Sequence, residues 1–400
     1  MKGSPWPIRC IECGNEAETE LPDSHCGRCG DLLEISTAGL RVGRRALFGA
    51  GGTGIWRFRA ALPFGRGVVP VSLGEGNTPL VRAENLGVAA RVGELYVKVD
   101  GQNPTGSFKD RGMTVAVTRA KEMGSRALVC ASTGNTAASL AAYAAKARIP
   151  AVVVVPQGNV ATGKLGQAFS YGARVFGVEG NFDVALKLVF DLVQQDRRFY
   201  LMNSVNPFRI EGQKVAAYEM YEQLGRVPDY LVLPVGNAGN ISAIWKGFKE
   251  LKAFGITRTL PRMVGVQAEG AAPIAEAHSR RSQMRPWSEP RTVATAIKIG
   301  NPVSWKKALR AISESGGAAL TVSDEEILAA REELATKEGL LVEAASAAPV
   351  AGLAKLRLPR LASVACVATG NGLKDIADSP VKMEVIPASS AQSLRDSLEV

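Results

Sequence analysis

The sequence predicts an α/β protein whose parallel sheets carry helices on both faces, preceded by a small zinc ribbon. The first observation is an alternation of short apolar runs with helical patterns through most of the 400 residues. The second is a glycine-rich loop between an apolar run and the helix that follows it, which recurs along the chain. The third is a pair of Cys-x-x-Cys motifs near the N-terminus.

Seven short segments have the length and composition of strands. They cover residues 96–99, 127–131, 151–155, 174–178, 230–235, 262–266 and 363–367. Helical patterns lie between them. Because neighbouring parallel strands need a long crossover, usually a helix, this alternation predicts parallel sheets.

The N-terminal cysteines have the spacing of a zinc ribbon. Cys10 and Cys13 form one Cys-x-x-Cys pair, Cys26 and Cys29 form the other, and a glycine follows each pair. Four thiolates arranged as two such turns suit one tetrahedral zinc ion. A redox dithiol is the alternative, which the duplicated pair disfavours. His25 is expected not to be a ligand.

Lys109 stands at an unusual place for a lysine. Glycine and proline interrupt the chain just before an amphipathic run, so Ser107 is expected as the N-cap and Lys109 in the first helical turn. The helix dipole there, together with any burial, lowers a lysine's pKa. A lysine that loses its proton easily can form a Schiff base. The alternative is a surface lysine paired with Asp110.

Two further loops are also rich in glycine and also precede a helix. Residues 132–136 lie between the strand at 127–131 and an alanine-rich helix at 137–147, and residues 236–240 lie between the strand at 230–235 and a helix at 241–251. A strand, a glycine loop and a helix together point backbone N–H groups at an anion. An ordinary turn between strand and helix is the alternative at 236–240.

Two other glycine patterns lack the context that nucleotide binding requires. Residues 49–54 match a dinucleotide pattern, but they follow two arginines rather than a strand. Residues 158–165 resemble a phosphate-binding loop, but Leu165 stands where a magnesium-binding hydroxyl belongs. We therefore expect no nucleotide site at either place.

Bulk properties exclude several classes of protein. The net charge is +10, but the basic residues are dispersed, which disfavours nucleic-acid binding. The chain has no apolar run long enough to span a bilayer and no apolar signal-peptide core, so we expect a cytoplasmic protein with no membrane partner. Two histidines, in the ribbon and in a polar loop, argue against a serine or cysteine triad.

Five segments together resemble the pyridoxal-phosphate enzymes of the tryptophan-synthase-like fold, type II, and most closely the threonine synthase family. They are residues 73–80, 103–112, 131–139, 203–209 and 236–240, in the family's order. The resemblance covers about residues 56–375 and implies two parallel-sheet domains with the cofactor between them. The implied division is a ribbon (1–36), a large domain (37–100 and 203–385), a small inserted domain (101–202) and a tail (386–400).

The resemblance also implies a cofactor site for pyridoxal 5′-phosphate. Lys109 would bind the cofactor as a Schiff base. Asn135 would contact the phenolic oxygen of its ring, and Thr369 would face the pyridine nitrogen, although Thr369 read alone could be a capping hydroxyl. The residues implied for the cofactor phosphate are Gly236, Asn237, Ala238, Gly239 and Asn240.

The substrate would lie against residues on the other side of the site. The substrate carboxylate would meet a helix start, with the side chains Ser132, Thr133 and Thr136. The residues implied for a substrate phosphate are Asn203, Ser204 and Arg209, with Thr136 assisting. Arg209 could instead be a surface arginine paired with Glu211. One departure is Ala344, where the family usually has proline.

The activity implied is that of a lyase in amino-acid biosynthesis, specifically threonine biosynthesis, which converts O-phospho-L-homoserine and water to L-threonine and phosphate in a homodimer. A threonine/serine dehydratase, or a synthase that uses O-phosphoserine, is the nearest alternative. A non-catalytic regulator that binds through the zinc ribbon is an alternative of another class. The intact Lys109 and Asn135 argue against a relict enzyme.

Overall fold

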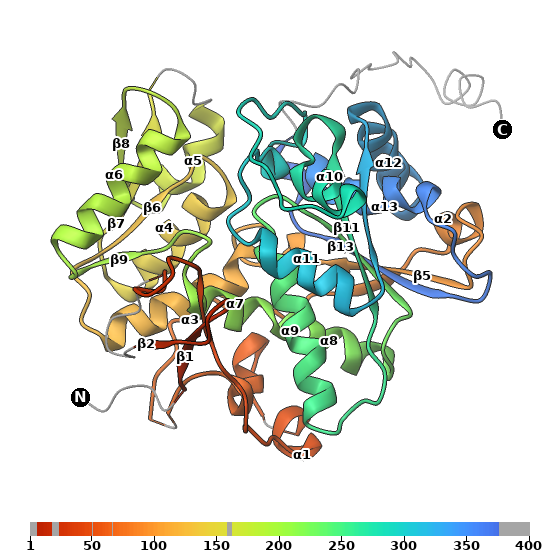
Figure 1. Ribbon diagram of the computed structural model, residues 1–400, viewed down its shortest axis with the longest axis horizontal. Helices are drawn as coiled ribbons and strands as arrows, with labels where there is room; N and C mark the ends of the chain where they lie inside the picture. Colours follow the sequence, from red (N-terminus) through yellow and green to blue (C-terminus); the bar gives the residue numbers. More distant parts are fainter. Residues whose placement is uncertain (1–5, 18–23, 50, 66, 158–161, 376–400) are drawn as a thin grey trace, which may run out of the picture.

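The computed structural model describes residues 6–17, 24–49, 51–65, 67–157 and 162–375. The predicted tail (386–400) and part of the 158–165 pattern lie outside these residues. Three sheets organise the described chain, and Figure 1 shows the two large ones side by side. Within the described residues, no helix is both long and apolar enough to cross a membrane.

The smaller α/β body is built on a four-stranded parallel sheet in the order β8-β7-β6-β9. Its strands are β6 (Ala127–Ala131), β7 (Ala151–Pro156), β8 (Arg174–Val178) and β9 (Phe199–Leu201). One face carries α6 (Phe182–Gln195), and the other carries α4 (Asn135–Ala147), which contacts α3 (Lys109–Glu122) and α5 (Thr162–Ser170). Three of these strands confirm the sequence prediction, and β9 was not predicted.

The larger body is built on a six-stranded sheet in the order β12-β11-β10-β13-β5-β4. Every pairing is parallel except that of the edge strand β4 with β5. The strands are β4 (Leu80–Arg82), β5 (Glu94–Val99), β10 (Tyr230–Pro234), β11 (Arg262–Ala268), β12 (Ala318–Val322) and β13 (Ser363–Ala368). The expected pair of parallel-sheet bodies is therefore confirmed, whereas the predicted domain boundaries remain a prediction.

Helices cover both faces of the larger sheet. On one face α13 packs on β10, β11 and β13, and α12 packs on α13 and α2; on the other face α11 contacts β11 and α9. The bounds are α1 (Arg44–Phe48), α2 (Glu84–Ala89), α7 (Pro207–Gln213), α8 (Val215–Leu224), α9 (Gly239–Ala253), α10 (Pro273–Arg280), α11 (Trp305–Glu314), α12 (Asp324–Glu338) and α13 (Ala344–Ala351).

The N-terminal segment forms a third, antiparallel sheet in the order β2-β1-β3. Its strands are β1 (Ile8–Cys10), β2 (Glu16–Ala17) and β3 (Leu33–Ile35). Ile8 and Leu33 belong to the main core, whereas Ile11 and Leu32 belong to the core on the α6 face of the smaller sheet. The ribbon is therefore packed against both bodies rather than appended to one.

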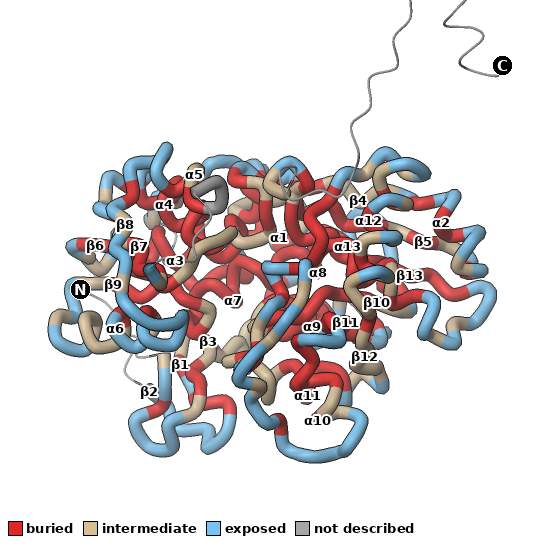
Figure 2. Tube along the Cα trace, turned by 90° about the horizontal axis from the view of Figure 1, so that it is seen from above, coloured by how far each residue is buried: buried red, intermediate tan, exposed pale blue. Residues whose placement is uncertain are grey.

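The buried residues run through the interior of both bodies, and the exposed residues lie around the outside (Figure 2). One apolar core runs from the smaller body through α3, α8 and α9 to the larger sheet. Because α3 lies between the two bodies, it is buried on nearly all sides, whereas the sequence predicted an amphipathic helix.

The prediction that Ser107 caps α3 is wrong. The N-cap is Phe108, and no side chain caps the helix. Ser107 instead pairs with Gly370 in an isolated antiparallel bridge, which keeps its backbone outside the helix. Its buried Oγ has no hydrogen-bond partner among the described residues.

Candidate active site

The loop before Lys109 is joined to the loop after β13. The backbone N–H of Phe108 donates to the carbonyl of Thr369 at 2.9 Å, and the N–H of Asn371 donates to the carbonyl of Gly106 at 2.9 Å. Gly106 has φ of 80°, a conformation that favours glycine. These contacts place Lys109, the first residue of α3, where the two bodies meet.

Lys109 is poised to lose its proton near neutral pH. Burial and, to a lesser extent, the charge of Arg209 lower its pKa to about 7, against the opposing effect of Glu343. Asp110 does not pair with it, because the Asp110 carboxylate accepts hydrogen bonds from Thr105 N at 2.7 Å and from other neighbours. Nothing in the described part of the chain forms an ion pair with Lys109.

Asn135 and Glu343 meet across the junction of the two bodies. Nδ2 of Asn135, at the start of α4, lies 3.0 Å from Oε2 and 3.2 Å from Oε1 of Glu343, the residue before α13. Burial raises the pKa of Glu343 to about 7. An amide and a carboxyl that can change its charge near neutral pH therefore lie together at the site.

Thr369 belongs to a buried pair of hydroxyl groups. Its Oγ1 lies 3.0 Å from Oγ of Ser346, and Ser346 Oγ accepts the N–H of Gly370 at 2.8 Å. The capping alternative fails, because no described backbone N–H donates to Thr369 Oγ1. The pair lies next to the Lys109 loop, because the backbone of Thr369 is hydrogen-bonded to Phe108.

Arg209 is a buried cation without a carboxylate partner among the described residues. It is 1% exposed, its Nη1 donates to the carbonyl of Met202 at 2.8 Å, and its Nε has no partner. The pairing with Glu211 does not occur, because Glu211 binds Lys214 at 2.6 Å and Lys246 at 2.5 Å. Burial lowers the pKa of Arg209 to about 10, so it stays charged at neutral pH.

The loop at 236–240 has unused hydrogen-bonding groups. Neither end of the buried Asn240 amide has a partner in the described structure. Ala238 adopts φ of 64°, which is costly for a residue with a Cβ and turns the chain into α9. Ser304 donates its N–H to the carbonyl of Asn237 at 3.2 Å, while its buried Oγ is unpartnered. Such a cradle at a helix start fits an anion.

The remaining predicted residues surround the same region. Ser132 and Thr133 are half-buried before α4, Thr136 is 9% exposed in its first turn, and Ser204 is half-buried after β9. Asn203 differs, because both ends of its amide bind the backbone of Ala131, at 3.0 and 2.9 Å. In this structure Asn203 fixes the loop that carries Ser132.

The chain matches the family described as pyridoxal-phosphate dependent enzyme over residues 71–370. A threonine synthase of Methanocaldococcus jannaschii is 49% identical, over 94% of this chain and 96% of that protein. A threonine synthase of Methanosarcina acetivorans is 50% identical, over 92% of each. The chain belongs to the threonine synthase family of pyridoxal-phosphate-dependent enzymes.

Solved structures show the same fold at lower similarity. A pyridoxal 5′-phosphate-dependent aspartate racemase matches with a TM-score of 0.65 and 24% identity, covering 76% of this chain and 92% of that one. Maize serine racemase matches with a TM-score of 0.65 and 20% identity, covering 80% and 91%. The comparisons therefore confirm the type II fold and the enzyme family expected from the sequence.

The residues of the site fit the family's cofactor. Lys109 has an amine that is readily uncharged, and the hydroxyl pair of Ser346 and Thr369 suits a ring nitrogen. The amide of Asn240 and the hydroxyl of Ser304 offer unpartnered donors to a phosphate. Sequence reasoning missed three side chains here: Glu343, Ser346 and Ser304. In the segment that contains Glu343 and Ser346, the sequence analysis noted only Ala344. The sequence around Ser304 has no pattern that would indicate a buried hydroxyl without a hydrogen-bond partner.

A buried ionic network fixes α3 beneath Lys109. Arg111, two residues further on, binds Asp100 at 2.8 Å and Glu219 at 2.7 Å, and Glu219 also binds Lys98 at 2.8 Å. All four side chains are inaccessible to solvent. Burial raises the pKa of Glu219, but the two cations outweigh it and hold that pKa well below the usual range. The network makes the start of α3 rigid.

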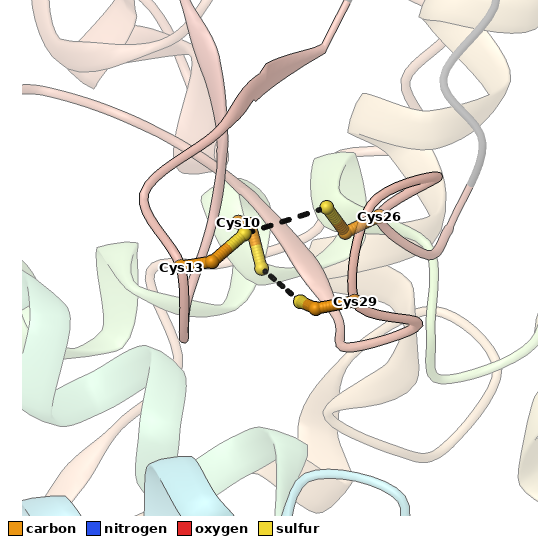
Figure 3. Close-up of side chains that lie close together, drawn as sticks. All are labelled: Cys10, Cys13, Cys26 and Cys29. Carbon is orange, nitrogen blue, oxygen red and sulfur yellow. Dashed lines mark hydrogen bonds between the residues drawn. The ribbon is translucent and has the colours of Figure 1, made fainter.

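The four N-terminal cysteines form one cluster, with all Sγ atoms within 4.8 Å of one another (Figure 3). Sγ of Cys10 lies 3.4 Å from that of Cys29, and Sγ of Cys13 lies 3.7 Å from that of Cys26. The glycine after each pair has positive φ, 68° and 75°, as expected. His25 lies beside the cluster without belonging to it. The arrangement is compatible with a tetrahedral metal site.

Proposed function

We propose that this protein catalyses the conversion of O-phospho-L-homoserine and water to L-threonine and phosphate. The observation that carries the substrate assignment is Arg209, a buried guanidinium that no described carboxylate neutralises and whose charge acts on Lys109. A buried unpaired cation is unfavourable unless an anion joins it. A phosphorylated substrate supplies that anion next to the reacting amine.

The residues divide the reaction between them. Pyridoxal phosphate, when bound, supplies an electron sink that stabilises negative charge on the substrate carbons. Lys109 takes protons from Cα and Cβ and returns protons at Cγ, which becomes the methyl group, and at Cα, since a pKa of about 7 suits both directions near neutral pH. Arg209 holds the phosphate that leaves from Cγ, and water then adds at Cβ. Ser132, Thr133 and the start of α4 orient the carboxylate.

The hydroxyl pair bears on the type of reaction. Ser346 and Thr369 would meet the ring nitrogen with hydroxyl groups rather than with a carboxylate. A hydroxyl leaves that nitrogen less protonated and the electron sink weaker. We infer that this favours elimination and replacement over transamination, in keeping with a synthase.

An assay of phosphate release and amino-acid product separates the candidates. The purified protein would be mixed with phosphohomoserine, phosphoserine, threonine and serine in parallel. Threonine and phosphate should appear in equal amounts with phosphohomoserine. Faster turnover of phosphoserine would favour a phosphoserine-using synthase, and rapid formation of a keto acid from threonine would favour a dehydratase.

We propose further that Cys10, Cys13, Cys26 and Cys29 hold a structural zinc ion. Four converging thiols on two tight turns support this assignment. Metal analysis should find one zinc per chain.

We also propose that the protein is cytoplasmic, forms a homodimer, does not bind nucleic acid and has the predicted domain boundaries. Sedimentation analysis would test the homodimer.

A further inference from the structure

The carboxylate of Glu343 connects the two bodies at the site. It belongs to the N-cap residue of α13 in the larger body, and it accepts hydrogen bonds from Asn135, the first residue of α4 in the smaller body. Gly370 gives it room, because a Cβ there would lie 2.1 Å from the carboxyl carbon. The side chain is thus held from two sides.

A charged carboxylate decides which end of the Asn135 amide faces it. An ionised carboxylate only accepts hydrogen bonds, so it requires Nδ2 of Asn135 to point toward it. A protonated Glu343 could instead donate to Oδ1 of Asn135, and the preference would be lost. The charge of Glu343 therefore controls the rotation of an amide that faces the site.

Glu343 is also the acidic group that acts on Lys109. Its negative charge raises the pKa of Lys109, whereas burial and Arg209 lower it. The charge of Glu343 is itself adjustable, because burial raises its pKa to about 7. The charged or polar groups that face it are the amide of Asn135, the carboxylate of Asp375 and the ammonium groups of Lys374 and Lys109.

Asp375 is held beside Glu343 by the backbone of α13. The N–H of Ala344 donates to Oδ2 of Asp375 at 3.2 Å. A proline at position 344 would have no N–H to donate. The alanine found here therefore brings a second carboxylate next to the first, and the like charge favours the protonated form of Glu343.

We propose that Glu343 is a positioning residue for the reaction: its carboxylate orients the Asn135 amide and places a negative charge beside Lys109, while Asp375, held by Ala344, sets how much of that charge is present. The inference rests on the proposed role of Lys109 in cofactor binding. It assigns a role to the alanine that departs from the family's usual proline.

The visible absorption of the cofactor-loaded protein, followed between pH 5.5 and 8.5 (a range about 1.5 units either side of the Glu343 pKa), tests this. The unmodified protein should show a titration step near pH 7, because the absorption responds to charge close to the Lys109 nitrogen. Glu343→Gln keeps the shape and removes the charge, so the step should disappear and kcat should fall about tenfold or more. Glu332→Gln, the same change at an exposed position on α12, should alter neither.

Two further variants test the part assigned to Asp375. Asp375→Asn keeps an acceptor for the N–H of Ala344 but removes the charge, so the step should move to lower pH by about half a unit or more. Ala344→Pro should move it in the same direction. The substitution is compatible with the backbone, since Glu343 has φ of −65° and ψ of 154° and proline suits the first helical position.

Each of the following outcomes would contradict one part of the proposal. A step that persists in Glu343→Gln, or that is absent from the unmodified protein, means that another group controls the charge near Lys109. An unchanged kcat in Glu343→Gln removes its role in the reaction, and an unchanged midpoint in Asp375→Asn removes the role of Asp375. If Lys109→Ala retains the visible band, the proposed cofactor site itself fails, and that failure is distinguishable from the others.

Discussion

Replacing Arg209 with leucine should separate phosphate recognition from the rest of the site. The guanidinium is 1% exposed and retains one hydrogen bond, to the carbonyl of Met202. Burial lowers its pKa to about 10, so the free protein keeps an unpaired buried charge at neutral pH. A phosphate group converts this unfavourable state into a charge-assisted pair.

The magnitude follows from comparing the free and the bound protein. Truncating one member of a buried charge pair weakens binding by about 2 to 5 kcal/mol, which corresponds to about 30-fold to several thousand-fold in kcat/KM for the phosphorylated substrate. In the unliganded variant, removing a buried unpaired charge stabilises the folded state. This gain offsets the stability lost with one hydrogen bond and some packing contacts. We therefore expect the unliganded melting temperature to change little.

Two measurements check this reasoning. Phosphate release from phosphohomoserine should fall strongly in Arg209→Leu, whereas slow side reactions with serine and the visible band of the cofactor should persist. Inorganic phosphate should raise the melting temperature of the unmodified protein more than that of the variant. Arg280→Leu, at a side chain that is 71% exposed, serves as the control. Equal loss with both substrates would show that Arg209 is structural, and the case for a phosphorylated substrate would fail.

Four other outcomes are expected. Lys109→Ala should abolish both the visible band of the cofactor and turnover, and retained turnover would exclude Lys109 as the binding residue. Below pH 7 the amine of Lys109 is increasingly protonated, so the rate at which cofactor-free protein regains the band should fall by about tenfold per pH unit once the pH is well below 7, and a flat profile would contradict the lowered pKa. The double change of Cys10 and Cys13 to serine should release zinc and lower the melting temperature while the band remains; a folded variant without any activity would mean that the ribbon supports the site directly. Glu219→Gln leaves two buried cations undercompensated and should lower the free energy of unfolding by about 3 to 5 kcal/mol, as denaturant titration would show.

The accuracy of the strand predictions depended on local hydrophobicity. The run at 127–131 coincides with β6 because it is continuously apolar and fully buried. The segment at 174–178 coincides with β8 although it begins with arginine and three of its five residues are exposed. The strand β9 was missed because three residues are too short to show a period. The strand β12 was missed because four of its five residues are only half-buried and its sequence includes no long apolar run.

Some residues of the site could be predicted from the nearby sequence, whereas others depend on contacts between distant parts of the chain. The positions of Lys109 and the loop at 236–240 follow from glycine at strand–helix junctions, which is a local signal. The contact between Asn135 and Glu343 joins residues 208 positions apart, and no local pattern encodes such a contact. The N-cap prediction at Ser107 failed for the same reason, because a bridge to Gly370 outweighed the local preference.

The pairing of the Lys109 loop with residues 369–371 has a consequence for how the protein is made. Ribosomes deliver α3 long before β13. Yet β13 lies between β10 and β5, and Thr369, the residue directly after it, supplies the backbone carbonyl that holds Phe108. Contacts so distant in sequence form slowly, since the intervening chain must first be ordered. A nascent chain that ends before residue 369 should therefore not capture the cofactor, and cofactor binding would mark the completed polypeptide.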